Sequence, residues 1–222
     1  MEKGNTHLIL NPIIEGMTKA GASVEVIFPQ KLKIRHCIGD FQCWFEKVGE
    51  CIHTDDMEMV YEKIREADIL VLATPIYLPL PGAFQNLLNR LMPLIEPLLE
   101  IHNGRTRGKW HDNVKVSKIV FVSSGGWWEV GNFEVVTHIV EEIAENSKSE
   151  FIGPIIRPHA DQLRHYGEKA KEVFRAAELA GQQIIERGNV EQTVLDTISQ
   201  PLITHEQAIE GGNRDYLSAR DS

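Results

Sequence analysis

Three apolar runs, separated by segments of helical periodicity, constrain the fold of this 222-residue chain more than any other feature. The runs are DILVLATP (68–75), KVSKIVFVSS (115–124) and SEFIGPIIRP (149–158). Each is short and nearly continuous, as expected of a strand that is buried on both faces of a sheet. Strands that alternate with helices predict a parallel sheet with helices on both faces. We therefore expect an α/β protein with a doubly wound parallel sheet.

The segments between these runs predict further elements. The β-branched stretch SVEVIFP (23–29) predicts a fourth strand. Residues 82–99 predict one amphipathic helix that is broken or kinked at Pro93 and Pro97, and residues 103–113 predict a polar connection. Apolar residues at helical spacing predict the other helices. These helices are expected over residues 6–22, 55–67, 133–146 and 160–188.

The rhythm of strands and helices ends near residue 188, and the composition then changes. No internal repeat or low-complexity linker divides the preceding part, so residues 1–188 are expected to form one domain. Residues 189–222 are mostly polar and are expected to form a C-terminal extension. Its one apolar anchor is ISQPLI (198–203).

Composition and charge exclude several classes of protein. The formal net charge is -9 and no basic run is present, so a general nucleic-acid binder is not expected. No apolar run is long enough to cross a bilayer, and no signal segment opens the sequence. Three cysteines are an odd number, which argues against a secreted disulfide framework. A cytoplasmic protein without a membrane partner is expected.

Ligands of doubly wound sheets bind where loops leave the carboxyl ends of the strands. We expect three loops at that edge, covering residues 37–51, 74–82 and 123–132. The second holds Tyr77 between prolines, which makes a stiff wall for a flat ring. The third has two consecutive glycines, which allow backbone N–H groups to approach a ligand closely. Each loop alone is most simply a turn, but the three together favour a planar, phosphorylated cofactor.

Four stretches carry a resemblance to a known family. They are EKGNT (2–6), CIGDFQCW (37–44), residues 55–91 and SSGGWWEVGNFEVV (123–136). Together they resemble the flavodoxin-fold NAD(P)H-dependent FMN reductases, and in particular the iron–sulfur flavoprotein-like branch. The resemblance implies a flavodoxin-like, three-layer α/β/α domain that binds FMN and accepts electrons from NAD(P)H.

The resemblance also implies which residues hold the flavin. Those that match the end of the family's phosphate loop are Gly4, Asn5 and Thr6. Those expected against the isoalloxazine ring are Thr74, Pro75, Ile76, Tyr77 and Leu78. Those expected along its other edge are Ser124, Gly125, Gly126 and Trp127. The flavin carries the chemistry in such enzymes, so no catalytic side chain is predicted.

One departure from the family lies at the beginning of the sequence. The family's first strand and the Ser/Arg part of its phosphate loop have no counterpart before Gly4. In the flavodoxin order this strand is central, and its loss would leave ladder groups unpaired on both sides. The expectation is an N-terminally shortened family member. The alternative is a variant that fills the gap differently.

A second departure concerns the cysteines. Cys37, Cys43 and Cys51 match the first, third and fourth thiolates of the iron–sulfur pattern, whereas Asp40 stands at the second. A four-iron cluster is normally held by four cysteines, and a carboxylate is a harder ligand. We therefore predict no metal site and expect the thiols to pack as small apolar groups. A cluster, or a zinc site completed by His36 or His53, is the alternative.

The resulting hypothesis is an FMN-dependent NAD(P)H oxidoreductase that passes electrons to a small molecule or a redox protein. Two alternatives stay open at this point. One is an FMN-binding electron carrier without NAD(P)H activity, and the other is a shortened remnant that has lost the flavin. The resemblance further implies a homodimer or homotetramer, with the C-terminal tail and the loop 101–113 as contact regions.

Overall fold

A parallel sheet of three strands forms the centre of the computed structural model, which describes residues 4–221. The strands β1 (Ile69–Pro75), β4 (Lys118–Ser124) and β5 (Glu150–Arg157) lie in the order β1-β4-β5. They coincide with the three apolar runs, and the predicted α/β fold is confirmed. Residues 1–3 of the predicted domain and residue 222 of the predicted extension lie outside the described part.

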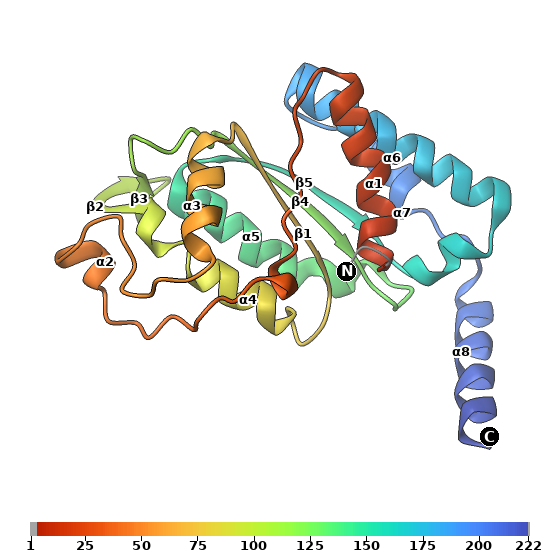
Figure 1. Ribbon diagram of the computed structural model, residues 1–222. Helices are drawn as coiled ribbons and strands as arrows, with labels where there is room; N and C mark the ends of the chain where they lie inside the picture. Colours follow the sequence, from red (N-terminus) through yellow and green to blue (C-terminus); the bar gives the residue numbers. More distant parts are fainter. Residues whose placement is uncertain (1–3, 222) are drawn as a thin grey trace.

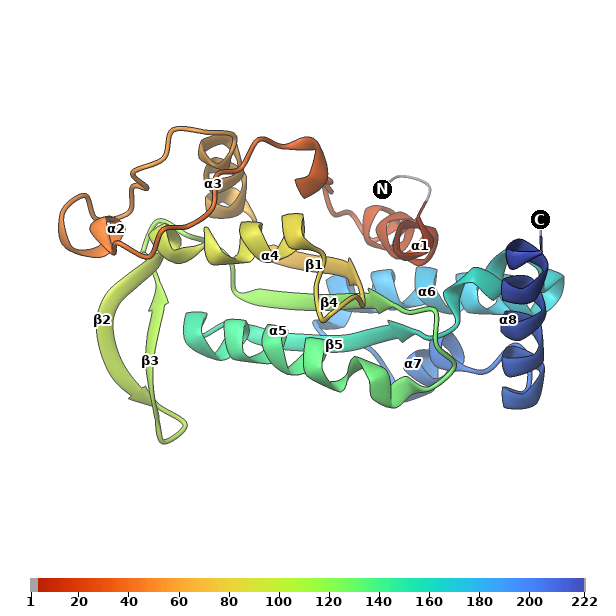
Figure 2. The ribbon, with the colours of Figure 1, turned by 90° about the horizontal axis from the view of Figure 1, so that it is seen from below.

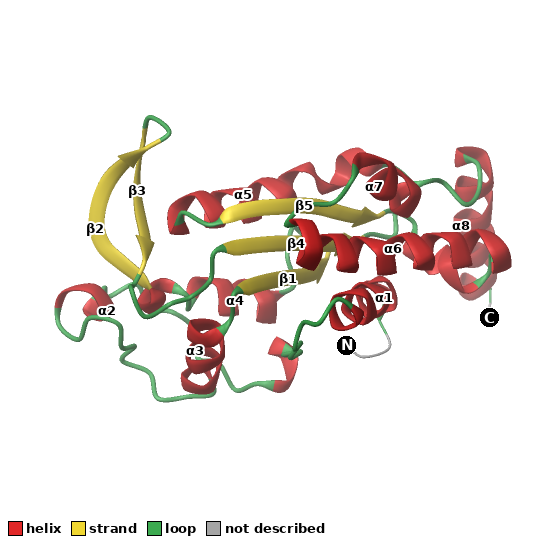
Figure 3. Ribbon diagram, turned by 90° about the horizontal axis from the view of Figure 1, so that it is seen from above, coloured by secondary structure: helices red, strands yellow, loops and turns green. Residues whose placement is uncertain are grey.

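Helices cover both faces of the sheet (Figures 2 and 3). One face packs against α1 (Asn5–Lys19), α6 (Gly167–Arg187) and α7 (Gln192–Ser199). The other packs against α3 (Met57–Glu66), α4 (Gly82–Asn89) and α5 (Glu134–Ser147). In β4, Val120 and Val122 belong to the first core, whereas Ile119 and Phe121 belong to the second. This alternation is the period of a strand with two buried faces.

Helices α1 and α6 touch through their backbones. A Cβ atom on Gly181 would lie 2.0 Å from the carbonyl oxygen of Ile13, and one on Gly16 would lie 1.9 Å from that of Glu178. Only glycine allows so close an approach. This contact fixes α1 on the sheet and thereby sets the position of its first turn.

The strand predicted over residues 23–29 is wrong. This segment passes beside the free edge of β1 without joining the sheet (Figure 3) and leads into η1 (Pro29–Lys31). Within the described part of the chain, β4 is the only strand paired with β1. A β-branched segment becomes a strand only when a neighbour satisfies its backbone groups, and this one has none.

The helix predicted over residues 82–99 is wrong beyond its first half. Helix α4 ends at Asn89, a 3₁₀ turn η2 (Met92–Leu94) follows, and the chain then enters a hairpin. The hairpin pairs β2 (Ile95–His102) with β3 (Arg105–Trp110), so the predicted polar connection is wrong as well. Its two-residue turn is Asn103–Gly104, with φ of 48° and 74°. Asn-Gly is a strong hairpin signal that the sequence reading missed.

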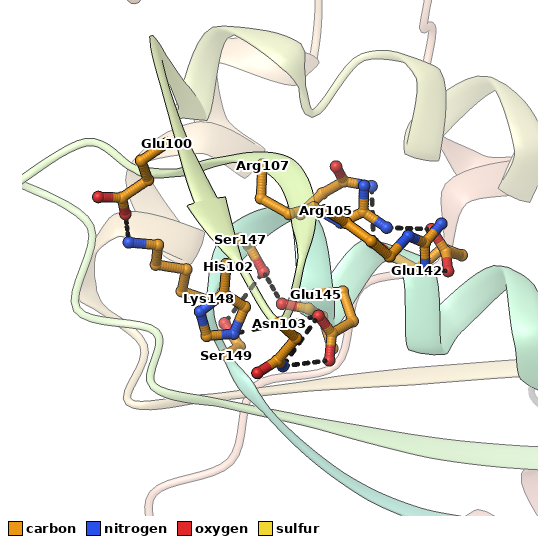
Figure 4. A network of polar contacts seen from close by, with 12 residues as sticks. Glu100, His102, Asn103, Arg105, Arg107, Glu142, Glu145, Ser147, Lys148 and Ser149 are labelled. Atoms are coloured by element: carbon orange, nitrogen blue, oxygen red, sulfur yellow. Dashed lines mark hydrogen bonds and ion pairs between the residues drawn. The ribbon is translucent and has the colours of Figure 1, made fainter.

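Ion pairs join this hairpin to the end of α5 (Figure 4). Glu142 accepts hydrogen bonds from both Arg105 and Arg107, the second at 2.9 Å. Lys148 pairs with Glu100 on β2. These contacts hold the hairpin away from the main sheet, and its apolar side chains at Leu98, Leu99 and Ile101 face solvent.

The remaining helical predictions hold with shifted ends. Helix α5 begins at Glu134, after the 3₁₀ turn η3 (Val130–Phe133). The helix predicted over residues 160–188 is divided into η4 (Ala160–Arg164) and α6. A further short helix, α2 (Gln42–Phe45), contains Cys43, and Cys37 and Cys51 lie before and after it.

The predicted C-terminal extension contains two helices that behave differently. Helix α7 buries Val194 and Ile198 in the core, and the predicted apolar anchor adds Leu202. Helix α8 (His205–Arg220) starts with a capping box at Thr204 and has no buried residue. It projects from the rest of the molecule (Figure 1). None of the helices within residues 4–221 is long and apolar enough to span a membrane.

Candidate functional site

Three segments that are distant in sequence meet at Ser124, the last residue of β4. The hydroxyl groups of Thr6 and Ser124 are hydrogen-bonded at 2.7 Å. The backbone N–H of Ile76 donates to the carbonyl oxygen of Ser124 at 3.0 Å. Ser124 itself is only 2% exposed. The structure therefore brings the predicted phosphate loop and the two predicted ring-binding loops to the carboxyl edge of the sheet.

The first turn of α1 forms one side of this edge. Gly4 is the N-cap residue, and no side chain caps the helix. The first helical hydrogen bond runs from the N–H of Leu8 to the carbonyl oxygen of Gly4. The N–H groups of the preceding residues, including Asn5 and Thr6, therefore have no partner within the helix. An N-terminus of this kind attracts anions, and phosphate in particular.

The loop after β1 forms a second side. Thr74 is buried, and its carbonyl oxygen accepts a hydrogen bond of 2.8 Å from the hydroxyl of Ser123. Pro75 is paired with Ser124 in the sheet. The loop then turns outward, with a 2.7 Å hydrogen bond from the N–H of Tyr77 to the carbonyl of Pro79. The Tyr77 side chain is 60% exposed, and that of Leu78 is exposed as well.

The two glycines after Ser124 have different surroundings. A Cβ atom on Gly125 would lie 3.0 Å from Cζ of Phe133, so this residue is confined by the core. A Cβ atom on Gly126 would have no atom within 4 Å, so its backbone faces open space. Trp127 follows with 75% of its surface exposed. A flat ligand can approach the backbone at Gly126 and cover the exposed side chain of the neighbouring Trp127.

The loop after β5 also belongs to this edge, although none of its residues was predicted to bind the cofactor. Gly125 donates its N–H to the carbonyl of Arg157 at 3.1 Å and accepts from the N–H of Ala160 at 3.0 Å. The N–H of His159 donates to the carbonyl of Trp127 at 2.9 Å. No motif marks these residues, because the contacts are made by the backbone.

Burial shifts the pKa of two ionisable groups, one at the end of β5 and one in the loop that follows. Burial lowers the pKa of His159, and the nearby Arg157 charge lowers it further, although Asp161 opposes the change. Burial also lowers the pKa of Arg157 to about 10. The Arg157 guanidinium donates to the carbonyl oxygens of Ile198 and Gln200, so it anchors the end of α7. At neutral pH the loop contains a neutral imidazole beside a charged guanidinium.

The three cysteines lie around one hollow of about 130 Å³. All three are free, and Asp40 lines the same hollow. Burial raises the pKa of the Cys43 thiol, and the other two thiols add to the shift. In the described residues, no group of three or more His, Cys, Asp or Glu side chains is arranged to hold a metal ion. A four-iron cluster is normally held by four thiolates, whereas this hollow provides three.

A buried ion pair fixes the loop that carries the cysteines. Arg90 and Asp55 are joined at 2.8 Å, and their side chains are 1% and 6% exposed. Arg90 also donates to the carbonyl of Arg35 at 2.7 Å, and the N–H of Arg35 donates to Asp55 at 2.8 Å. Burial alone would raise the pKa of Asp55, but its hydrogen bonds with Arg90, Arg35 and Met57 hold it below 3.8.

The expectation that the cysteine loop lies at the carboxyl edge of the sheet is wrong. Helix α2 lies toward the end of the molecule at which β4 and β5 begin, away from Ser124 (Figures 1 to 3). The physical reason is that residues 23–29 form no strand, so no strand end carries the following loop to the edge.

A larger hollow of about 550 Å³ lies at the amino ends of β1 and β4. Its walls are the ends of α1 and α6 and the residues that open the two strands, among them Ile69 and Lys118. It lies at the opposite end of these strands from Ser124 and beside the free edge of β1. The hollow is therefore separate from the predicted ring-binding loops.

Comparison with known proteins gives a family match over most of the chain. The family model described as NADPH-dependent FMN reductase matches residues 1–145. An iron–sulfur flavoprotein of Methanocaldococcus jannaschii is 32% identical over 101 residues, which are 45% of this chain and 50% of the relative. One of Archaeoglobus fulgidus is 36% identical over 89 residues, which are 40% of this chain and 43% of the relative. The matches thus span about half the length of these relatives or less.

Solved structures share the fold at low sequence identity. An NAD(P)H:quinone oxidoreductase from Methanothermobacter marburgensis has a TM-score of 0.55 and 16% identity, with 83% of this chain and 92% of that chain covered. A flavone reductase has a TM-score of 0.59 and 20% identity, with 84% and 59% covered. These neighbours establish a flavodoxin-like fold.

Proposed function

This chain belongs to the NADPH-dependent FMN reductase family, and from that premise we propose that it binds FMN at the Ser124 edge and oxidises NAD(P)H. The observation that carries the proposal is the meeting of three segments at Ser124. Thr6 reaches it through its hydroxyl group and Ile76 through its backbone N–H. These contacts bring the N-terminus of α1 next to two loops that carry exposed aromatic side chains, which supports the proposal.

The described residues fit an FMN molecule in their chemistry. The N–H groups of Asn5 and Thr6 would hold the phosphate, with the Thr6 and Ser124 hydroxyl groups beside them. Tyr77 and Trp127 would flank the ring, and Gly126 would leave room for it. Removing the exposed faces of two aromatic side chains from water would stabilise the complex.

A bound flavin supplies the capacity to take a hydride from a nicotinamide and to release electrons to an acceptor. The protein's part is to orient the ring, exclude water from one face and supply backbone donors along its edge. No acid or base side chain is required for this role, so we propose no catalytic residue. The acceptor is proposed to be a small molecule or a redox protein, and a structural neighbour is named as a quinone oxidoreductase.

Steady-state kinetics tests this function. Purified protein is supplied with FMN, then with NADH or NADPH, and a soluble quinone is added as acceptor. Oxidation of the nicotinamide that depends on both FMN and protein supports the proposal. Flavin binding without turnover would instead identify the alternative, an FMN-binding electron carrier. A chain that binds no flavin would contradict both.

We also propose that the protein functions as a homodimer or homotetramer. Helix α8 has no buried residue and exposes Ile209, Tyr216 and Leu217. The hairpin exposes Leu98 and Ile101 on β2. Exposed apolar groups on two projecting elements favour association. Light scattering after size-exclusion chromatography tests this proposal, and a monomer at micromolar concentration would contradict it.

A further inference from the structure

Two adjacent tryptophans in the loop after β4 have different surroundings. Trp127 is 75% exposed at the Ser124 edge. Trp128 is half-buried, and its Nε1–H donates to the carbonyl oxygen of Ile203 at 3.1 Å. Its ring also stacks on that of His205, with the ring centroids 4.8 Å apart and the planes at 19°. Trp128 therefore joins the loop after β4 to the C-terminal extension.

The segment that supplies this carbonyl group is itself fixed to the sheet. Arg157 is the last residue of β5, and its guanidinium donates to the carbonyl oxygens of Ile198 and Gln200 at 2.8 and 2.9 Å. Leu202 is 3% exposed and lies in the core that contains α1, α6 and α7. A side chain that binds to the neighbouring carbonyl of Ile203 is therefore held in place relative to the strands.

The composition of the loop makes such an anchor useful. Residues 124–131 include three glycines, which lose more conformational freedom on ordering than any other residue type. Most of the loop after Gly125 is exposed. Its first part is held by backbone hydrogen bonds at Gly125 and Trp127. The side chain of Trp128 adds a restraint directly after this part.

The restraint bears on ligand binding because of how a flexible loop affects affinity. Only the fraction of molecules with the loop in a binding-competent shape can take up the ligand. A contact that holds the loop in that shape beforehand removes this cost. Trp128 can do so without touching a flavin, since its N–H group and its ring are both engaged by the C-terminal extension.

We propose that Trp128 is a positioning residue, which holds residues 124–127 in the shape that accepts the isoalloxazine ring by anchoring them to the carbonyl of Ile203. The inference rests on the proposed function, because it requires a flavin at the Ser124 edge. It goes further by making the C-terminal extension a support of the flavin site, through a contact between residues that are 75 positions apart.

The test compares the loss of two equivalent indole N–H groups. Trp128→Phe removes the donor to Ile203 but keeps an aromatic ring, and His205→Ala removes the stacking partner. Trp44→Phe is the matched control, because Nε1 of Trp44 donates to the carbonyl of Met92, also at 3.1 Å. Fluorescence titration measures FMN affinity, and visible circular dichroism at saturating FMN reports the surroundings of the ring. Thermal unfolding measures the stability of the flavin-free proteins.

We expect Trp128→Phe to weaken FMN binding by roughly 5-fold or more, because the loop loses the hydrogen bond that holds its competent shape. The circular dichroism of the bound flavin should also change, since Trp127 is no longer held in one arrangement beside the ring. His205→Ala should weaken FMN binding by about 2–3-fold. Trp44→Phe should leave the affinity and the spectrum unchanged, although it removes the same kind of hydrogen bond.

Unchanged FMN affinity in folded Trp128→Phe would overturn the inference while leaving the proposed function intact. An equal loss of affinity in Trp44→Phe, or a weaker affinity with the wild-type flavin spectrum, would also overturn it, because either would show an effect of stability alone. If Trp128→Phe does not fold, His205→Ala decides, since the His205 side chain is 46% exposed. Unchanged affinity there overturns the inference. A wild type that binds no flavin would overturn the proposed function, and the inference with it.

Discussion

The Ser124 edge and the hollow lined by the three cysteines are held in place by different kinds of contact. Ser124 ends the central strand, is almost fully buried and is tied to its neighbours through backbone groups. The cysteines lie on a long, mostly exposed loop, which depends on the buried Arg90–Asp55 ion pair for its position. The geometry of the first site is fixed by the sheet, and that of the second by one pair of side chains.

This difference determines how each region responds to change. Backbone contacts at a strand end persist through most side-chain substitutions, since every residue except proline has the same backbone donor and acceptor. A loop held by a buried ion pair is disrupted when one partner is removed, because the other charge is left uncompensated. The cysteine loop should therefore be the more fragile of the two.

The largest effect is expected from Asp55→Asn. This change leaves the Arg90 guanidinium buried without its carboxylate, and it should lower the free energy of unfolding by about 3–5 kcal/mol. Urea denaturation measures this change. The thiols should also react faster with a disulfide reagent, because the loop loses its anchor. Asp112→Asn is the control, since that carboxylate is 94% exposed in its ion pair with Lys109. A loss below about 1 kcal/mol would contradict the role of the pair.

The Arg90–Asp55 ion pair also predicts how the free energy of unfolding changes as the pH falls. The folded pKa of Asp55 lies below its ordinary value of 3.8. Its contribution to stability is therefore present above that value and is lost as the pH falls through the folded pKa. Unfolding measured between pH 5 and 2.5 should show a smaller loss of stability in Asp55→Asn than in the wild type. Equal slopes would contradict the assignment.

A smaller loss of stability is expected when the contact between α1 and α6, which supports the Ser124 edge, is disturbed. In Gly181→Ala, the new Cβ would lie 2.0 Å from the carbonyl oxygen of Ile13, so α1 must move. The expected cost is about 1–3 kcal/mol, and FMN binding should weaken because the first turn of α1 shifts. Gly212→Ala in α8 is the matched control, since a Cβ there meets no atom within 4 Å. Equal stability of the two variants would contradict close contact between α1 and α6.

The smallest expected effect is on the amount of iron that the protein retains, and not on its stability. After anaerobic reconstitution with iron and sulfide, the wild type should retain less iron than a complete cluster, because Asp40 offers a carboxylate where four thiolates are needed. Asp40→Cys should retain more iron, measured chemically and by electron paramagnetic resonance, whereas Asp112→Cys should not. A stoichiometric cluster in the wild type would show that three thiols and Asp40 suffice.

The sequence predicted the elements whose pattern is local. The buried strand 118–124 is recognisable from its apolar run, and the end of that run locates Ser124. Residues 23–29 have an equally clear strand pattern but remain unpaired, because strand formation depends on a neighbour. The cysteine loop was misplaced for the same reason. Its position depends on where the preceding segment goes.

Other features were missed because nothing in the local pattern marks them. Arg90 and Asp55 are 35 positions apart at the two ends of the stretch 55–91, and nothing in the local sequence pattern shows that they form an ion pair. Arg157 reaches the Ser124 edge through the end of β5, and its backbone contact with Gly125 can be seen only once the strand order is known. The hairpin turn at Asn103 was the one missed feature with a local signal.

The most direct test of the account is an equilibrium titration of the purified protein with FMN, followed by visible absorbance after removal of free flavin. We expect the wild type to retain about one FMN per chain. Gly126→Val should fold normally but retain little, because its side chain fills the open space where the ring would lie. The control Gly212→Val should bind as the wild type does. A wild type that retains no flavin, or a Gly126→Val variant that binds equally well, would contradict a flavin site at the Ser124 edge.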